Sequence, residues 1–403
     1  MTTNVIAVRF GEVFLKGGKR AWFTKRLRES LERQVRRAGD WRVRELHDQF
    51  LVVHGGSRGL QDLRDFEITD SLRQALQRTF GVASWYPGRL VSREIGDLER
   101  EVASLVETHV AGRASFKVES SRADKEYPLD SMALNRRLGA VIFQRCQVPV
   151  RLQDPEVVVR VHILPQGALI SVGSEKGPGG LPVGTAGRVL LLLSGGIDSP
   201  VAGWQMLRRG CDLDAVHFEA APWTRPEARD KVRVLSEFLA SFQQGMRLFV
   251  VPFGAVQAHL RDHAPGPLLV VLYRRMMMRI ASRLARRTGA LALATGENLA
   301  QVASQTLPNL AVIEEAAELP VLRPLLAFDK QETMTLARRI GTYETSILPY
   351  DDCCSLFVPP HPETAAGADR VRAVEAQADL APWVDQAVGA TEEICLGETV
   401  TAR

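Results

Sequence analysis

At 403 residues the chain is too long for one ordinary hydrophobic core, so we expect two or three domains. Its 45% hydrophobic and 24% charged residues are typical of a soluble globular protein and exclude a disordered or fibrous chain. No apolar run approaches the roughly 20 residues needed to span a bilayer. The N-terminal segment contains no apolar secretion core, so we expect a cytoplasmic protein without a membrane segment.

The net charge of +4 is unevenly distributed along the chain. Residues 1–60 contain 13 Lys and Arg against 6 Asp and Glu, whereas residues 361–403 contain 3 against 8. The basic first segment indicates a polyanionic partner. A solvated basic helix face explains the same charge equally well, so charge alone leaves both interpretations open.

Residues 1–60 predict a small α+β domain. Alternating apolar residues over 4–10 predict a short strand, the segment 19–39 has helical spacing with a basic outer face and ends on a glycine, and 43–56 predicts two further strands. Residues 61–176 alternate between helical and strand patterns. They predict a second α/β domain without a catalytic acid–base cluster.

The remaining sequence predicts a linker, a larger domain and a tail. Residues 177–187 are rich in Gly and Pro, as linkers are. Over residues 188–360, apolar strands alternate with helical segments, which predicts a doubly wound parallel sheet with ligands at the carboxyl ends of its strands. After residue 360 the pattern fades, so we expect residues 361–403 to form an acidic tail with a frayed end.

The strongest motif is LLLLSGGIDSP, in which an apolar strand runs into a glycine-containing turn and then a helix. Gly195 and Gly196 allow a tight turn that brings backbone N–H groups close to a bound anion. The positive end of the helix dipole points at the same place. Ser194 and Ser199 add hydroxyl donors, and Asp198 can hold a Mg²⁺ that bridges phosphates. The G-K-[ST] ending of the Walker motif is missing, and the segment resembles the PP-loop of enzymes that cleave ATP between its α and β phosphates.

Further candidates for nucleotide contacts lie at or after the next strand ends, although each also suits core packing or an exposed helix. A ring can stack on adenine, an arginine can pair with a phosphate, an amide can bind a base edge, and a lysine can offer charge to the leaving group. The methionines at 276–278 are predicted core residues. The candidates are His217, Phe218, Arg274, Arg275, Gly296, Glu297, Gln301, Gln305 and Lys330.

The five cysteines form no C-x-x-C pair, so we expect neither a disulfide framework nor a structural metal site. Cys146 and Cys211 lie in apolar surroundings and are predicted to be buried and inert. Cys353 and Cys354 are adjacent in the polar, proline-bounded segment LPYDDCCSLFVPPHP and are candidate reactive thiols. We expect Cys395 to be a loose terminal cysteine, with a role as a second thiol left open.

The motifs together are similar to those of the tRNA 4-thiouridine synthetase family, also known as tRNA sulfurtransferases or thiamine-biosynthesis sulfur carrier enzymes. The similarity runs over residues 4–362 and includes VRFGEVFLKGGKR, SSRADKEYPLDSM, GGLPVGTAGRVLLLLSGGIDSPVAGW and ATGENLAQVASQTL. It implies a ferredoxin-like domain at 1–60, a tRNA-binding THUMP domain at 61–176 and a PP-loop ATP pyrophosphatase domain at 188–360. Many family members append a rhodanese-like domain. About 40 residues after the catalytic loop are too few for one, so we expect the form without it.

The resemblance also implies roles for particular residues. Asp198 and Lys330 would assist catalysis, and Cys353 would handle the sulfur, with its neighbour Cys354 as the residue most easily confused with it. The loop residues Ser194, Gly195, Gly196 and Ser199 would bind phosphate. The other implied contacts to ATP are Leu192, Leu193, His217, Phe218, Arg274, Gly296 and Gln305.

The implied reaction uses ATP and Mg²⁺ to adenylate O4 of the uridine at position eight of tRNA. A persulfide on Cys353, or sulfide released from it, would then attack C4 and expel AMP to give 4-thiouridine. The implied partners are tRNA, a cysteine desulfurase or other persulfide donor, a thiamine sulfur-carrier protein and a second copy of the chain in a homodimer. Sulfur supply for thiamine thiazole synthesis is a further expectation. Two alternatives stay open: an amidating PP-loop ligase that acts on a small substrate, and a non-catalytic tRNA-binding protein that senses ATP.

Overall fold

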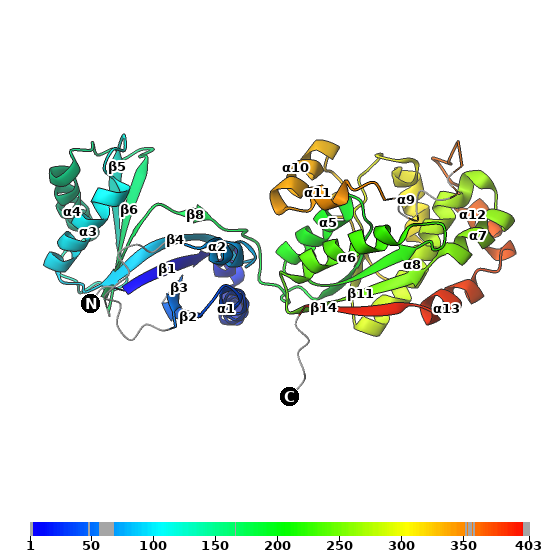
Figure 1. Ribbon diagram of the computed structural model, residues 1–403, viewed down its shortest axis with the longest axis horizontal. Helices are drawn as coiled ribbons and strands as arrows, with labels where there is room; N and C mark the ends of the chain where they lie inside the picture. Colours follow the sequence, from blue (N-terminus) through cyan, green and yellow to red (C-terminus); the bar gives the residue numbers. More distant parts are fainter. Residues whose placement is uncertain are drawn as a thin grey trace, which may run out of the picture. The chain divides into compact units, whose positions relative to one another are not determined.

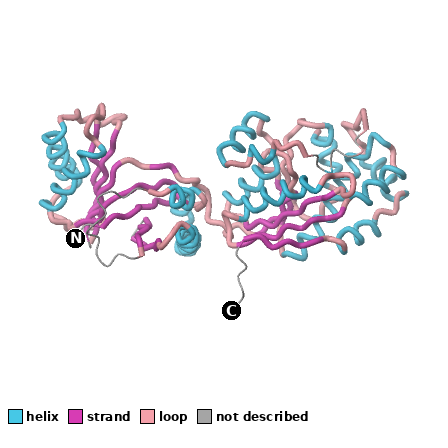
Figure 2. Tube along the Cα trace, in the orientation of Figure 1, coloured by secondary structure: helices cyan, strands magenta, loops and turns pink. Residues whose placement is uncertain are grey.

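The computed structural model divides into two compact units, residues 1–181 and 182–403. Figure 1 shows the order of helices and strands in each unit, and Figure 2 shows that each contains a sheet with helices packed against it. The structure describes residues 3–46, 49–55, 68–165, 167–350, 353, 357 and 359–397.

The first unit is built on an eight-stranded sheet with the order β2-β3-β1-β4-β7-β6-β5, in which β8 also pairs with β4. β1 pairs antiparallel with both β3 and β4, whereas β5 and β6 are parallel. The strands are β1 (Thr3–Phe10), β2 (Trp41–Leu46), β3 (Gln49–His54), β4 (Val82–Val91), β5 (Phe116–Arg122), β6 (Val157–Leu164), β7 (Gly167–Val172) and β8 (Glu175–Lys176).

Two groups of helices pack on this sheet around separate cores. The helices are η1 (Glu12–Lys19), α1 (Arg20–Arg37), α2 (Asp70–Gln77), α3 (Ile95–His109) and α4 (Ser131–Cys146). Apolar residues of α1, α2, β1, β3 and the first half of β4 form one core, and those of α3, α4, β5, β6 and β7 form the other. The predicted boundary between residues 60 and 61 falls outside the described residues. The first core extends past it, because Leu72, Leu76 and Trp85 are buried there.

The second unit contains a six-stranded sheet with the order β13-β12-β9-β10-β11-β14. The first five strands in this order are parallel, and β14 is antiparallel to β11. This confirms the predicted doubly wound parallel sheet. The strands are β9 (Arg188–Leu192), β10 (Asp212–Glu219), β11 (Gly245–Pro252), β12 (Ala292–Ala294), β13 (Val321–Leu322) and β14 (Glu392–Gly397).

Helices cover both faces of this sheet because its strands are apolar on both sides. Along β9, Leu190 and Leu192 pack into the core under α8, whereas Leu191 lies against Gly203 of α5 on the opposite face. The helices are α5 (Asp198–Arg208), α6 (Pro226–Ala240), α7 (Gly254–His263), η2 (Gly266–Leu268), α8 (Leu269–Thr288), η3 (Ala303–Gln305), α9 (Leu307–Glu314), α10 (Lys330–Ile340), α11 (Tyr343–Ser346), α12 (Ala368–Gln377) and α13 (Ala381–Gly389).

The expected separate acidic tail is wrong, because the C-terminal segment belongs to the second unit. Val371 and Val374 of α12 and Val384 of α13 are buried in the core under the sheet. β14 extends the sheet as an edge strand, and Cys395 lies on it opposite Arg247. The Ala- and Glu-rich composition hid this arrangement, since only a few apolar residues face the core and one acidic residue, Glu375, is buried against arginines of α8.

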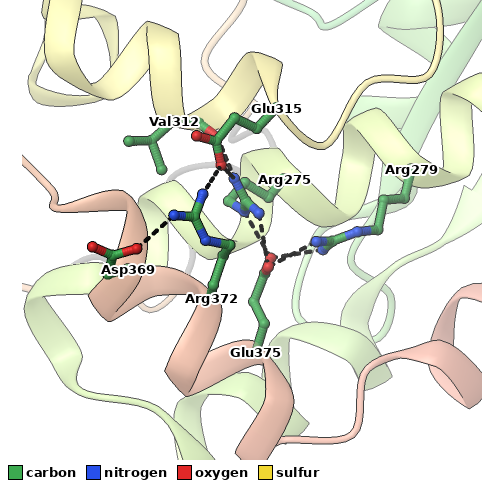
Figure 3. A network of polar contacts seen from close by, with 7 residues as sticks. All are labelled: Arg275, Arg279, Val312, Glu315, Asp369, Arg372 and Glu375. Atoms are coloured by element: carbon green, nitrogen blue, oxygen red, sulfur yellow. Dashed lines mark hydrogen bonds and ion pairs between the residues drawn. The ribbon is translucent and has the colours of Figure 1, made fainter.

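A buried ion pair at Glu375 and an exposed one at Arg372 connect α12 to α8 and to the residue after α9 (Figure 3). Glu375 of α12 accepts hydrogen bonds from Arg275 at 2.8 Å through both oxygens and from Arg279 at 2.7 Å. Arg372 of α12 donates to Glu315, the residue that follows α9, at 2.9 Å. Arg275 is 3% exposed, so its charge depends on these partners.

Among the described residues, no helix combines the length and the apolar character that crossing a membrane requires.

Candidate active site

A cavity of about 220 Å³ lies at the carboxyl ends of β9, β10 and β12. Since β10 and β12 flank β9 on opposite sides, the chain reverses its direction across the sheet here, which is where doubly wound proteins bind ligands. The lining residues are Leu192, Leu193, Ser194, Gly196, Asp198, Ser199, Val216, His217, Phe218, Arg274, Met277, Thr295, Gly296, Glu297, Gln305 and Cys353.

The turn between β9 and α5 is held by two serines. The Ser194 N–H donates to Ser199 Oγ at 3.0 Å, and the Ser199 hydroxyl donates to the Ser194 carbonyl at 3.2 Å. The Gly196 N–H donates to Ser194 Oγ at 3.3 Å. These bonds fold the turn over the start of α5, so that backbone N–H groups and the positive end of the helix dipole meet at the cavity. The arrangement suits an anion such as pyrophosphate.

Gly296 closes the opposite wall of the cavity because it has no side chain. A Cβ at this position would lie 2.6 Å from the Ser199 nitrogen and 2.7 Å from the Asp198 carbonyl carbon. The segment after β12 therefore touches the backbone of the first turn of α5. Only glycine permits this approach without moving one of the two backbones.

Asp198 has two partners that come from distant parts of the chain. Lys330 Nζ lies 3.1 Å from Asp198 Oδ1, and Gln301 Nε2 donates to Asp198 Oδ2 at 3.3 Å. Lys330 is the first residue of α10, whose start is fixed by a capping box between Asp329 and Glu332. The ammonium group of Lys330 is thereby held at the start of α5, beside the turn.

A buried carboxylate, Glu297, lies next to Gly296 in the cavity wall. Its Oε2 accepts hydrogen bonds from Thr295 Oγ1 and from Arg323 Nε, both at 2.9 Å. Its Oε1 accepts no hydrogen bond from the residues that the structure describes, and Arg274 Nη1 lies 3.9 Å from it. Because the Glu297 side chain is 2% exposed, it orients Arg274 through a poorly screened charge.

The floor of the cavity contains an aromatic pair and two polar side chains. The Phe218 ring packs edge-on against Phe253 with centroids 5.2 Å apart. His217 Nδ1 lies 3.1 Å from the Leu193 carbonyl, which ties β10 to the turn. Gln305 is buried, and its Oε1 accepts no hydrogen bond from the described part of the chain, so it is available to a ligand donor.

Cys353 reaches this cavity from the C-terminal half of the unit. It is buried, and its carbonyl accepts a hydrogen bond from Gln257 Nε2 of α7 at 2.8 Å. Its neighbour Cys354 lies outside the described residues. Cys353 and the anion-binding turn therefore line the same cavity.

The other cysteines lie away from the cavity. Cys211 is buried as predicted, and burial raises the pKa of its thiol to about 11, which makes it unreactive at neutral pH. Cys146 is only half-buried, contrary to prediction, because it lies at the last residue of α4. Cys395 is exposed on β14 and is not at a loose end of the chain.

The structure brings the predicted site residues together with two differences. Gly195 supports the turn without lining the cavity, and Lys330 reaches the site through Asp198. Of the two candidate arginines, Arg274 faces the cavity and Arg275 faces Glu375. Sequence reasoning missed Met277, Thr295 and Arg323 and left Glu297 without a role, because a core methionine and a structural ion pair have the same sequence pattern.

The first unit presents a separate basic surface. Arg26 and Arg36 of α1 pair with acidic residues of the same helix, at 3.6 Å from Glu29 and 2.6 Å from Glu32. The exposed basic side chains of α1, the residue before it and β2 are Lys19, Arg20, Lys25, Arg26, Arg28, Arg36, Arg37, Arg42 and Arg44. This set is consistent with the basic excess in the sequence and suits contact with a polyanion.

Comparison with known proteins matches each part of the chain. Family models match for the ThiI ferredoxin-like domain over residues 5–85, the THUMP domain over 92–173 and the thiamine biosynthesis protein (ThiI) over 184–380. The chain is similar to a crystallised 4-thiouridine synthetase in complex with RNA and bound ATP. The two share 36% sequence identity and superpose with a TM-score of 0.87, over 98% of this chain and 100% of that one.

Curated relatives are similar over nearly their whole length. A probable tRNA sulfurtransferase of Brevibacillus brevis is 41% identical over 97% of this chain and 96% of its own. A probable tRNA sulfurtransferase of Thermus thermophilus is 43% identical over 94% of this chain and 90% of its own. The chain therefore belongs to the tRNA sulfurtransferase family.

Proposed function

We propose that this protein uses ATP to replace O4 of a tRNA uridine, the one at position eight, with sulfur to give 4-thiouridine. The observation that carries the proposal is that Cys353 and the turn at residues 194–199 line the same cavity. The relatives named as tRNA sulfurtransferases and the RNA- and ATP-bound 4-thiouridine synthetase support the choice of substrate and cofactor.

In the activation step, the turn and the start of α5 bind the β and γ phosphates that leave as pyrophosphate. Asp198 fits a Mg²⁺ site, since this ion needs only one or two carboxylates when phosphates and water complete its shell. When bound, Mg²⁺ neutralises the charge that develops on the phosphates. Lys330, held beside the turn, adds a second positive charge there, and Arg274 contributes a guanidinium from α8.

The remaining contacts orient the nucleotide. His217 and Phe218 flank the adenine, Gln305 binds it through its amide, and the Leu192–Leu193 backbone and Gly296 bound the pocket around it. These side chains are buried, so they exclude water from the reacting phosphate. O4 of the uridine attacks the α phosphate, and pyrophosphate departs.

In the second step, sulfur carried by Cys353 attacks C4 of the adenylated uridine and AMP leaves. The uridine must leave its stacked position to enter the cavity, at a cost of a few kcal/mol. A persulfide on Cys353 brings the sulfur, and a thiol then reduces the sulfur–sulfur bond that links the product to Cys353. The burial of Cys353 protects the persulfide from solvent between turnovers.

The proposal includes the partners and the setting. The first unit, as ferredoxin-like and THUMP domains, grips tRNA through its shape and backbone charge. The sulfur comes from a cysteine desulfurase or another persulfide donor, and the protein acts in the cytoplasm as a homodimer. The same sulfur relay also serves thiamine thiazole synthesis through a sulfur-carrier protein.

Three variants test the proposal when pyrophosphate release and 4-thiouridine are measured on the same tRNA preparation, the latter by mass spectrometry of nucleosides. Asp198→Ala is expected to abolish both signals while tRNA binding persists. Cys353→Ser is expected to abolish 4-thiouridine and keep pyrophosphate release, with Cys354→Ser as its matched control. Loss of thiolation in Cys354→Ser alone would move the sulfur step to that residue.

The same assay separates the alternatives. An amidating ligase would release pyrophosphate regardless of added tRNA. An ATP-sensing binding protein would release none under any condition. Either result in the unaltered protein would overturn the proposed function.

A further inference from the structure

One face of α7 holds three features that the proposed chemistry leaves unexplained. Gly254, Gln257 and Arg261 are spaced by three and four residues, so they lie on the same side of the helix. The Gln257 amide holds the Cys353 carbonyl. The other two residues each hold an aromatic ring.

The first ring is Trp223, in the loop after β10. A Cβ on Gly254 would lie 2.7 Å from Trp223 Cζ3 and 2.9 Å from the Ala221 carbonyl, so the indole rests directly on the start of α7. The backbone N–H of Trp223 donates to the Ala220 carbonyl at 2.8 Å, which fixes the loop. Despite this support, 47% of Trp223 is exposed.

The second ring is Phe357, four residues after Cys353. Its centroid lies 5.7 Å from that of Trp223 with the planes at 72°, and the Arg261 guanidinium lies 4.8 Å above it. Phe357 has a φ of 55°, a left-handed conformation that a phenylalanine adopts only when its surroundings hold it there. Arg261 Nε also donates a hydrogen bond to Asp262 Oδ1 at 2.8 Å.

These contacts place an exposed indole about one helical turn along α7 from the residue that holds Cys353. We propose that Trp223, supported by Phe357 and Arg261, stacks against an unpaired base of the RNA substrate as the target uridine enters the cavity. The inference rests on the proposed function and adds an RNA contact within the catalytic unit itself. A rigid aromatic face beside a guanidinium binds any base through stacking and its phosphate through charge.

A base is the occupant that this surface favours. In the sulfur step C4 must reach Cys353, and α7 binds the Cys353 backbone through Gln257, three residues from the glycine against which Trp223 rests. A nucleotide beside the extruded uridine is therefore the RNA group closest to Trp223 in this arrangement. When a uridine leaves the RNA helix, the bases beside it lose stacking energy. Stacking on the indole restores part of that energy.

Trp223→Ala and Trp223→Phe test the proposal in the full-length protein, with Leu291→Ala as the matched control. Leu291 is 67% exposed and precedes β12, at the amino ends of the parallel strands and away from the carboxyl ends where the cavity lies. We expect Trp223→Ala to raise the KM for tRNA in the thiolation reaction by roughly 5- to 150-fold. The KM of Trp223→Phe should lie between that of Trp223→Ala and that of the unaltered protein. The control should leave the KM unchanged. Unchanged thermal unfolding and ATP binding would show that the fold and the nucleotide site are intact.

Photocrosslinking keeps the inference separate from the proposed function. An RNA with 5-bromouridine in place of a nucleotide next to the target uridine is expected to crosslink to Trp223 or Phe357 whether or not ATP is turned over. The inference would be overturned if crosslinks formed only with the first unit and the KM for tRNA in Trp223→Ala equalled that of the unaltered protein. It would also be overturned if Trp223→Ala slowed the formation of the Cys353 persulfide by a donor protein and left the KM for tRNA unchanged. The surface would then bind the donor protein and not the RNA.

Discussion

Replacing Gly296 with alanine is expected to disable the nucleotide site while the fold persists. The added Cβ would lie 2.6 Å from the Ser199 nitrogen, 2.7 Å from the Asp198 carbonyl carbon and 2.8 Å from the Ser199 Cα. All three are backbone atoms, so no side-chain rotation relieves the overlap. Because favourable contact needs about 3.5–4.0 Å, the segment after β12 and the first turn of α5 must separate by roughly 1 Å.

That separation translates into two measurable losses. A displacement of about 1 Å in a catalytic constellation lowers the rate about 100-fold, and overpacking lowers the free energy of unfolding by roughly 1–3 kcal/mol. We expect the first loss in tRNA-dependent pyrophosphate release and the second in urea unfolding. Gly389→Ala is the matched control, because a Cβ on this last residue of α13 would meet no atom within 4 Å. Pyrophosphate release at the unchanged rate in Gly296→Ala would refute the role assigned to this close approach.

Three further predictions concern the buried charges. Glu297→Gln is expected to raise the KM for ATP at least about tenfold, because Arg274 loses the carboxylate that orients it. The KM is measured by pyrophosphate release, and an unchanged KM would mean that Glu297 has only a structural role. Glu375→Gln is expected to lower the free energy of unfolding by about 3 kcal/mol, since Arg275 stays buried and keeps only Glu315, at 3.4 Å, as a charged partner. Asp385→Asn, in an exposed pair, should change little. Burial alone would raise the pKa of Glu375, but hydrogen bonds from its two arginine partners lower it overall. Its stabilisation is therefore complete at neutral pH and lost as the pH falls through the folded-state pKa, so urea unfolding of the unaltered protein should weaken more steeply in acid than that of Glu375→Gln.

The turn at residues 194–199 and the parallel sheet could be predicted from the sequence because both leave local patterns. Apolar strands of the length of β9 and β10, each followed by a helical segment, indicate a doubly wound sheet without knowledge of distant contacts. Glycines and serines between a buried strand and a helix indicate an anion-binding turn for the same reason. Each signal lies in neighbouring segments of the chain.

The features that escaped prediction depend on partners far away in the chain. Glu297 is an ordinary acidic residue until Arg323 and Arg274 surround it. The segment after residue 360 looks like a solvated tail until Glu375 meets two arginines of α8. The local sequence gives the chemistry of a side chain, but it does not show which residues of distant helices that side chain will contact.

The cavity and the C-terminal segment are connected through neighbouring residues of the same helix. Arg274 faces Glu297 in the cavity wall, while Arg275 donates to Glu375 of α12. Since a helix turns as a rigid body over one residue, the Glu375 pair also fixes the rotation of α8 that points Arg274 into the cavity. Two neighbouring residues at the end of α9 also bind different partners: Glu314 accepts a hydrogen bond from Arg323, and Glu315, the residue after the helix, accepts one from Arg372. The C-terminal segment therefore does more than cover the sheet: its buried pair with Arg275 holds the helix that points Arg274 into the cavity.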